Sequence, residues 1–193
     1  MTKTGVITVV VLVCLALWGV GAYNGLVSDD ERVTAEWQNV EACYQRRADL
    51  IPNLVETVKG YAKHESETLK EVIEARAKAT SITIDPSNVT PEQLAEYQKA
   101  QSGVSGALGK LLAVAESYPD LKANQNFLEL QSQLEGTENR IAVARKRYND
   151  VAKEFNAAIR RFPNNFIASF AGLEKHPYFE AEEGAEKAPK VQF

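Results

Sequence analysis

Apolar residues are arranged in two ways along this chain, first as one continuous run and then at regular intervals. Residues 5–27 include no charged side chain, whereas from Asp29 onward almost every helical turn carries one. The most apolar part, residues 5–23, would be about 28 Å long as a helix, close to the thickness of the hydrocarbon layer of a membrane. The run therefore predicts one membrane-spanning helix.

A cleavable signal peptide is the competing interpretation of this run. Lys3 would form its basic start, and Gly19 and Gly21 would offer small residues at a cleavage site. However, the run is longer than the apolar region of most signal peptides, and Trp18 and Tyr23 lie where aromatic side chains anchor a membrane interface. These features favour an uncleaved anchor.

Beyond the run, apolar residues recur every three or four positions, as expected for helices that bury one face. The first series comprises Val33, Trp37, Val40, Tyr44, Ile51, Leu54, Val58, Tyr61, Leu69 and Val72. The series keeps its phase across Pro52, so a kink near Ala48 is expected there rather than a reversal. We predict one helix from the membrane to about Thr80, and whether Pro52 breaks it is left open.

Two further long helices and a short one follow. Thr90, Pro91 and Gln93 form a capping box at the start of the second helix, which ends near Pro119. The third helix extends from about Phe127 to Phe162, and a short apolar segment follows at residues 166–173. In the second helix, the small residues Ser102, Gly103, Ser105, Gly106 and Gly109 predict a close approach of another helix.

No alternation typical of strands is present, so the sequence predicts an all-α protein. Its architecture would be an N-terminal transmembrane helix followed by an elongated antiparallel bundle of three long helices and a short C-terminal one. We divide the chain into a membrane anchor (residues 1–27), a helical bundle (28–173) and an acidic tail with an aromatic end (174–193).

Charge and motifs argue against several functions. The net charge is −4, without the concentrated basic surface that a nucleic-acid partner requires. A phosphate-binding loop is excluded because Leu111 follows Gly109-Lys110 where Ser or Thr is needed. A di-metal bundle is excluded because neither His64 nor His176 follows a Glu by three positions. We predict a non-enzymatic protein with no catalytic residue, cofactor, metal site or small-molecule substrate.

Arg47 is the unusual polar residue, because it falls on the apolar series of the first helix. A buried charge of this kind has to be paired, or its side chain has to reach solvent. An ion pair between helices that sets their register is the favoured interpretation. A polar site for a partner stays open.

Two surfaces are candidates for protein contacts. The predicted first helix is much longer than the second, so its membrane-proximal residues would lack cover, and we predict that they mediate formation of a homo-oligomer: Val33, Trp37, Val40 and Tyr44. Aromatic residues collect after the third helix, predicted to lie far from the membrane, and would cap the bundle or offer a docking surface: Phe162, Phe166, Phe170, Tyr178 and Phe179. The end of the tail, with Val191 and Phe193, resembles an extended docking segment that would bind the chain's own bundle or a protein partner.

The chain also resembles a known family. The stretch QRRADLIPNLV from Gln45, continued by VKGYAKHE up to Glu65, is similar to the signature of the LemA family of bacterial membrane proteins. Later blocks resemble that family at residues 118–127, 134–141, 144–145, 148–149, 155–156, 162–164 and 178–180. The resemblance covers residues 23–180. It implies an N-terminal membrane helix, a helical bundle on either side of the membrane, and no catalytic residues.

Together these observations predict a scaffold or adaptor of the bacterial envelope that is involved in membrane organisation. It would cross the cytoplasmic (inner) membrane once. Lys3 and the amino terminus lie on one side of the run, and Asp29, Asp30, Glu31 and Arg32 lie on the other, so the positive-inside rule favours an extracytoplasmic bundle. The alternative is an accessory subunit of a membrane protease or sensor complex.

Overall fold

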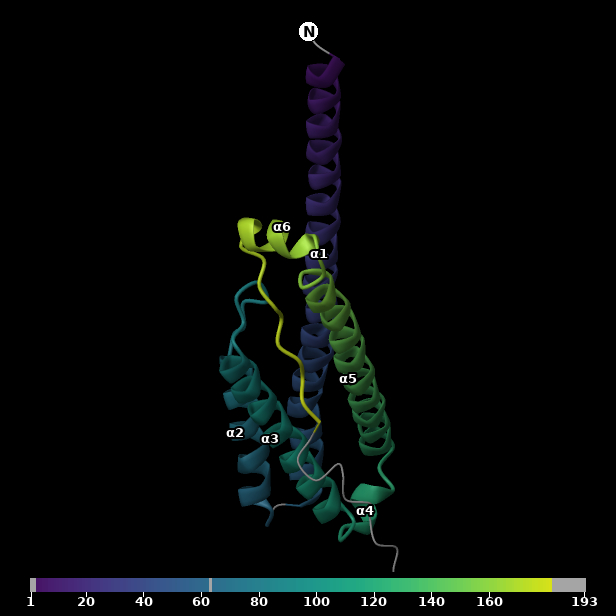
Figure 1. The fold of residues 1–193 in the computed structure, drawn as a ribbon. Helices are drawn as coiled ribbons and strands as arrows, with labels where there is room; N and C mark the ends of the chain where they lie inside the picture. Colours follow the sequence, from purple (N-terminus) through teal and green to yellow (C-terminus); the bar gives the residue numbers. More distant parts are fainter. Residues whose placement is uncertain (1–2, 63, 182–193) are drawn as a thin grey trace, which may run out of the picture.

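The computed structural model describes residues 3–62 and 64–181, and this part of the chain is all-α, as the sequence predicts (Figure 1). Neither described range contains a strand. The helices are α1 (Lys3–Tyr61), α2 (Ser66–Ser81), α3 (Pro91–Ala115), α4 (Pro119–Lys122), α5 (Gln125–Ala158) and α6 (Asn164–Ala171).

The longest helix, α1, is about 88 Å long at the usual rise per residue. Its N-terminal part projects alone from the bundle, and Leu26 is its first buried residue. The rest of α1 forms the centre of the bundle. Helix α5 runs back along it toward the projecting part, and α2 and α3 pack on each other beside it (Figure 1).

Pro52 lies inside α1 and does not end it. Proline has no backbone N–H, so the carbonyl of Ala48 one turn earlier loses its normal partner within the helix. The side chain of Arg76 on α2 replaces that partner, because its Nε–H donates to the Ala48 oxygen at 2.7 Å. A contact with a second helix thus compensates for the proline.

Helix α1 ends at Tyr61 and the chain changes direction before α2 begins at Ser66, so the predicted extent of the first helix, to about Thr80, is wrong (Figure 1). The end of α1 and the start of α2 are held by other elements: Asn124 donates to the hydroxyl of Tyr61 at 2.8 Å, and the hydroxyl of Tyr118 donates to Glu65 at 2.9 Å. The apolar spacing continues into α2 because both helices bury one face, so the spacing does not report the change of direction.

The predicted start of α3 is confirmed in detail. The Gln93 N–H donates to Thr90 Oγ1 at 3.2 Å, and the Thr90 N–H donates to Gln93 Oε1 at 2.9 Å, which completes the capping box. Asn124 caps the start of α5, and its side chain accepts from the Phe127 N–H at 3.0 Å. The short C-terminal helix predicted from the sequence is α6.

The glycines of α3 do not permit a close helix approach, so that prediction is wrong. A Cβ atom added at Gly103, Gly106 or Gly109 would meet no atom within 4 Å. The neighbouring Val104, Ala107 and Leu108 face the core instead, so the glycines lie on the outer side of the helix.

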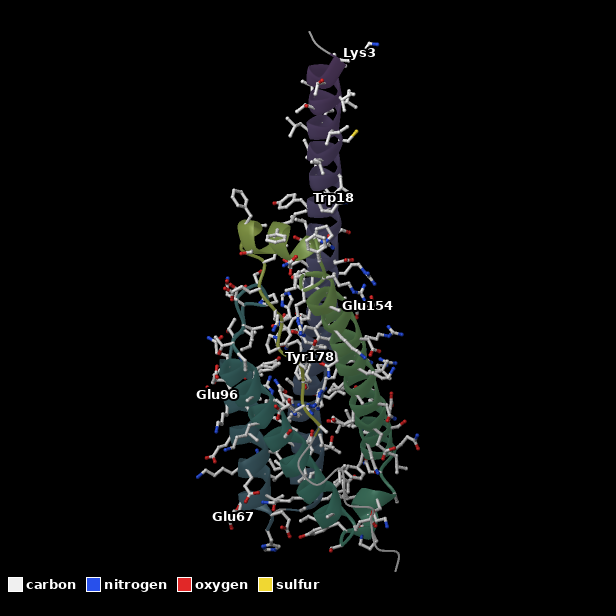
Figure 2. The ribbon with its side chains drawn as sticks, viewed as in Figure 1. Lys3, Trp18, Glu67, Glu96, Glu154 and Tyr178 are labelled. Carbon is white, nitrogen blue, oxygen red and sulfur yellow. The ribbon has the colours of Figure 1, made fainter. Side chains whose placement is uncertain are left out.

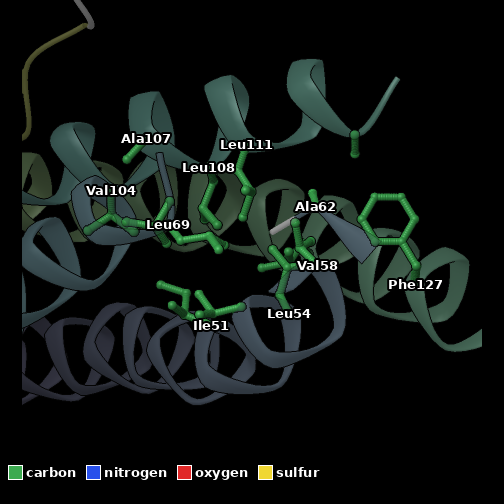
Figure 3. Close-up of a cluster of buried hydrophobic side chains, with 14 of the residues drawn as sticks. Ile51, Leu54, Val58, Ala62, Leu69, Val104, Ala107, Leu108, Leu111 and Phe127 are labelled. Carbon is green, nitrogen blue, oxygen red and sulfur yellow. The ribbon is translucent and has the colours of Figure 1, made fainter. Parts of the chain in front are cut away.

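Buried side chains form two clusters along the bundle. One lies at the end remote from the projecting helix and joins the C-terminal half of α1 to α2, α3 and the start of α5; it includes Ile51, Leu54, Val58, Leu108 and Leu111 (Figure 3). The second cluster lies nearer the projecting helix and includes Leu26, Trp37, Tyr148, Phe155 and Phe179. The core therefore begins inside the segment predicted as anchor and includes part of the predicted tail.

Candidate functional site

The most elaborate side-chain arrangement surrounds residues 174–181, which follow α6 as an extended segment that we call the strap. The strap descends from α6 between α3 and α5 (Figure 1). It makes no helix or strand, so its backbone groups depend on side chains of the bundle for hydrogen bonds.

Two asparagines of α5 hold the strap by its backbone. Asn156 donates to the His176 carbonyl at 2.8 Å and accepts from the His176 N–H at 2.9 Å. Asn149, two turns earlier on the same face, makes the same pair with Phe179 at 2.8 and 2.9 Å. A carboxamide carries one acceptor and two donors, so it can pair with both backbone groups of an extended residue.

A third carboxamide acts from the opposite side of the strap. Gln98 on α3 donates to the Glu180 carbonyl at 2.9 Å and accepts from the Glu180 N–H at 3.1 Å. Arg145 on α5 also donates to that carbonyl, at 2.7 Å. The bundle thus binds the strap as proteins bind an extended peptide, with main-chain hydrogen bonds supplying the attachment.

Phe179 is the apolar anchor of the strap and is only 5% exposed. Its ring stacks on Trp37 of α1, with centroids 5.7 Å apart, and meets Tyr148 edge-on at 5.3 Å. The guanidinium of Arg145 lies 5.2 Å from the ring centroid. The stacked, edge-on and cation–π contacts each add stabilisation to that gained by burying the ring. Phe179 thus connects the strap to α1 and α5.

The N-terminal part of the strap, at His176 and Pro177, is held by polar contacts. The buried His176 lies with its Nε2 2.6 Å from Asp30 Oδ1 on α1. The Tyr148 hydroxyl donates to the Pro177 carbonyl at 3.1 Å. Burial, with a smaller effect of the nearby Tyr178, raises the pKa of Tyr148 far above its usual value.

Arg47 forms a second polar centre, and the predicted ion pair between helices is present. The Arg47 side chain is 2% exposed and donates to Glu138 on α5 at 2.8 Å. It also donates to Ser105 at 2.7 Å and to the side chain and carbonyl of Gln101 on α3, at 2.6 and 3.0 Å. One guanidinium thus links three helices, and charge-assisted bonds of this kind fix their register.

A small recess of about 200 Å³ lies beside this centre, lined in part by Arg47, Arg76, Tyr97 and Gln101. Burial, followed by nearby Tyr44 and Glu41, raises the pKa of Tyr97 far above its usual value. The guanidinium in its wall already has four hydrogen bonds. These hydrogen bonds pair the Arg47 guanidinium with groups of α3 and α5.

The four residues predicted for self-association are buried within the same chain: Val33, Trp37, Val40 and Tyr44. They pack in the second cluster against α3, α5 and the strap. The inference that they lack cover is wrong, because α5 and the strap return along α1. Self-association itself stays a prediction, and these side chains offer no free surface for it.

The aromatic residues predicted for docking separate into groups. Phe179 is buried and Tyr178 is half-exposed in the strap, whereas Phe162, Phe166 and Phe170 lie exposed on or before α6. Helix α6 lies where the projecting part of α1 leaves the bundle, so the prediction that these residues lie far from the apolar run is wrong (Figure 1). Val191 and Phe193 lie outside the described residues.

Sequence reasoning missed the three carboxamides that hold the strap: Gln98, Asn149 and Asn156. A signal was present, because Asn149 and Asn156 each follow a buried aromatic residue and are seven positions apart, on one face of a helix. A polar side chain repeated beside a buried series indicates a polar partner. The sequence pattern did not predict that this partner is an extended segment of the same chain.

The part of the chain that contains the strap and most of its partners is similar in sequence to known proteins. The sequence model of the LemA family matches residues 36–193, a range that contains Trp37 and the strap. Protein LemA of Metamycoplasma hominis is 28% identical over 164 residues, which cover 85% of this chain and 71% of that protein. The magnetosome protein MamQ 2 of Paramagnetospirillum magneticum is 28% identical over 175 residues, which cover 82% of this chain.

The magnetosome protein MamQ of Magnetospirillum gryphiswaldense is also 28% identical, over 180 residues that cover 81% of this chain. The chain matches 64% of the length of each of these two magnetosome proteins. Both are thus longer than the region that they share with this chain.

Proposed function

Because the chain belongs to the LemA family, we propose that it is a membrane-anchored, non-enzymatic scaffold or adaptor of the bacterial envelope. In this role it presents a helical bundle at the surface of the cytoplasmic membrane and takes part in organising that membrane. Its relatives among the LemA and magnetosome proteins support a function at a membrane.

One observation carries the proposal: α1 continues without a break from the apolar run into the core of the bundle. The exposed apolar side chains of residues 6–20 belong to the same helix as the buried Trp37 and Ile51. A catalytic domain on a flexible tether could take many positions relative to the membrane. A bundle built on the anchor helix keeps a fixed distance from the membrane and a fixed orientation. A fixed geometry is what a scaffold requires.

The same continuity supports an uncleaved anchor over a signal peptide. Cleavage near Gly19 or Gly21 would cut α1 within a few residues of Leu26, where the second cluster begins.

Gentle purification from native membranes tests the scaffold. We expect the full-length chain in the membrane fraction, in a particle larger than one copy, because a scaffold must hold other proteins or further copies of itself. The particle size also tests self-association. Recovery as a lone monomer in a mild detergent would contradict the proposal, and one protease or sensor in fixed stoichiometry would identify an accessory subunit instead.

Two variants of the apolar run test whether formation of the larger particle depends on the membrane anchor. Leu12→Arg with Leu15→Arg places two charges in the apolar run, where each costs about 3 kcal/mol. We expect this variant to leave the membrane fraction and to lose the larger particle, whereas the control Leu12→Ile with Leu15→Ile behaves as the unchanged chain. An unchanged particle in the soluble fraction would show that anchoring is irrelevant to assembly.

The proposal includes an extracytoplasmic bundle, because two positive groups, Lys3 and the amino terminus, precede the run, whereas Arg32 follows it among acidic residues. Lys146→Cys on the exposed face of α5, in a Cys43→Ala chain, tests it. We expect a membrane-impermeant maleimide to label residue 146 in intact cells. Labelling only after lysis would place the bundle in the cytoplasm.

A further inference from the structure

Helix α6 and the residues before it expose large aromatic side chains, which water-soluble proteins usually bury. Phe162 is 81%, Phe166 66% and Phe170 98% exposed. They are spaced four residues apart, and the rings of Phe162 and Phe166 are in contact, with centroids 6.0 Å apart. We call these three residues the aromatic row.

The rest of α6 shows which way the row faces. Ala168 is buried, and it lies on the opposite side of the helix from Phe166 and Phe170, about 160° from each around the axis. Ile167 is partly buried against the same core cluster as Ala168, so the helix packs these two residues on the protein and turns its phenylalanines away from it. A typical surface helix turns its largest apolar residues inward. An exposed apolar surface of this kind marks a site of interaction.

The position of α6 identifies what the row meets. Ala168 packs in the same cluster as Leu26, the first buried residue of α1, so α6 lies at the end of the charge-free run. Figure 1 shows α6 crosswise to α1 at this level, and Figure 2 shows Trp18 just beyond it on the projecting helix. Trp18 and Tyr23, both half-exposed, are the aromatic residues expected at the membrane interface.

The charges around α6 also suit a membrane surface. Residues 164–171 carry no charged side chain, and the exposed Arg160 and Arg161 come directly before the aromatic row. Two of the acidic residues near the same level are paired within the protein, Asp29 with Arg32 at 3.3 Å and Asp30 with His176 at 2.6 Å. Basic residues beside an apolar face are typical of helices that lie in the interface of an anionic bilayer.

From this geometry we propose that α6 lies in the plane of the membrane and inserts the aromatic row, Phe162, Phe166 and Phe170, between its lipids. The bundle is then attached by two elements, the span and α6, and its direction relative to the bilayer is set by both. The occupant is lipid rather than a second copy, because insertion of α1 brings α6 to the bilayer surface in every copy. This inference rests on the proposed anchoring of α1.

A fluorescent probe on the row tests the inference in the full-length chain. In a background with Cys14→Ala and Cys43→Ala, Phe170→Cys is labelled with the environment-sensitive dye NBD. The protein is reconstituted into vesicles of phosphatidylcholine and phosphatidylglycerol in equal amounts, with and without a lipid that carries a quenching spin label near the top of its acyl chain. Glu67→Cys, exposed at the opposite end of the bundle (Figure 2), is the matched control.

We expect the probe at residue 170 to shift to shorter emission wavelengths and to lose most of its fluorescence to the spin-labelled lipid, while the probe at residue 67 is unaffected. Quenching of tryptophan fluorescence in the same vesicles reports insertion of α1, because Trp18 lies on the apolar run whereas Trp37, the other tryptophan, is fully buried in the bundle. Quenched Trp18 with an unquenched residue 170 overturns the inference and leaves the anchor intact. An emission shift at residue 170 without quenching overturns it too, because protein then surrounds the row. Unquenched Trp18 refutes the anchoring on which both proposals depend.

Discussion

The ring of Phe179 lies stacked on the indole of Trp37, with centroids 5.7 Å and ring planes 8° apart. The first residue belongs to the strap and the second to the helix that carries the apolar run, so the first and last segments of the described chain meet in one core. This contact closes the bundle over α1. It also explains why the apolar residues of α1 between Val33 and Tyr44 need no second copy for their cover.

Phe179→Ala should therefore destabilise the protein strongly. Removal of a buried Phe side chain costs about 3–5 kcal/mol, from lost burial and from the cavity left behind. Urea unfolding of the full-length chain in detergent, followed by circular dichroism, measures this loss. Phe170→Ala is the matched control and should change the unfolding free energy little, because its ring is 98% exposed. Equal effects of the two substitutions would contradict the described packing.

Asn156→Ala should loosen the strap. It leaves the N–H and carbonyl of the buried His176 without their side-chain partner, at a cost of about 1–3 kcal/mol. Limited proteolysis of the full-length chain should then cut residues 174–181 faster than in the unchanged protein. Asn165→Ala, at an exposed position on α6, should leave the cutting rate as it is. A strap equally resistant in both variants would show that Asn156 does not hold it.

Arg76 and Pro52 should be energetically coupled. Arg76→Met removes the donor to the Ala48 carbonyl and should cost about 1–2 kcal/mol. In a Pro52→Ala chain, the restored N–H of residue 52 can bond that carbonyl, so the same substitution should cost at least about 0.5 kcal/mol less. A double-mutant cycle of urea unfolding measures the difference, and purely additive effects would refute the compensation.

Alanine at the outer glycines of α3 should stabilise the protein. Gly103→Ala and Gly106→Ala add a Cβ that meets no atom within 4 Å, and each should gain up to about 1 kcal/mol from helix propensity. Gly172→Ala, with equally open space but a φ of 71°, should instead lose stability because only glycine adopts that backbone conformation without strain. Thermal unfolding of the three variants compares them, and a loss at Gly106 would indicate a close neighbour there.

The stability of the bundle should fall in strong alkali. Burial raises the pKa of Tyr148 and of Tyr97 in the folded state above the value of 10.0 for a free tyrosine. Their contribution is thus complete below about pH 10 and is lost as the pH rises toward the folded-state pKa, because the unfolded chain then releases protons that the folded chain retains. Urea midpoints between about pH 9 and pH 11 measure the slope, which Tyr148→Phe should flatten. An unchanged slope in this variant would contradict the role of Tyr148.

Local sequence signals were reliable where the cause of the structure is local. The capping box at Thr90 depends on residues three positions apart, and the long charge-free run is a property of one segment; both could be predicted without neighbours. The need for a partner of Arg47 could also be predicted, because a buried charge is costly in any fold. Its identity, Glu138 on α5, required the alignment of two helices.

The apolar pattern alone determined that this chain is all-α and has one segment suited to a membrane, because periodicity and length depend only on neighbouring residues. The tertiary structure decided what covers each apolar face. Phe170 and Phe179 are the same residue type, nine positions apart, yet one is almost fully exposed at the end of the apolar run and the other is buried on Trp37. The physical reason is the change of direction between α1 and α2 and the return of α5 along α1. Burial depends on which elements meet, and the spacing along one helix does not contain that information.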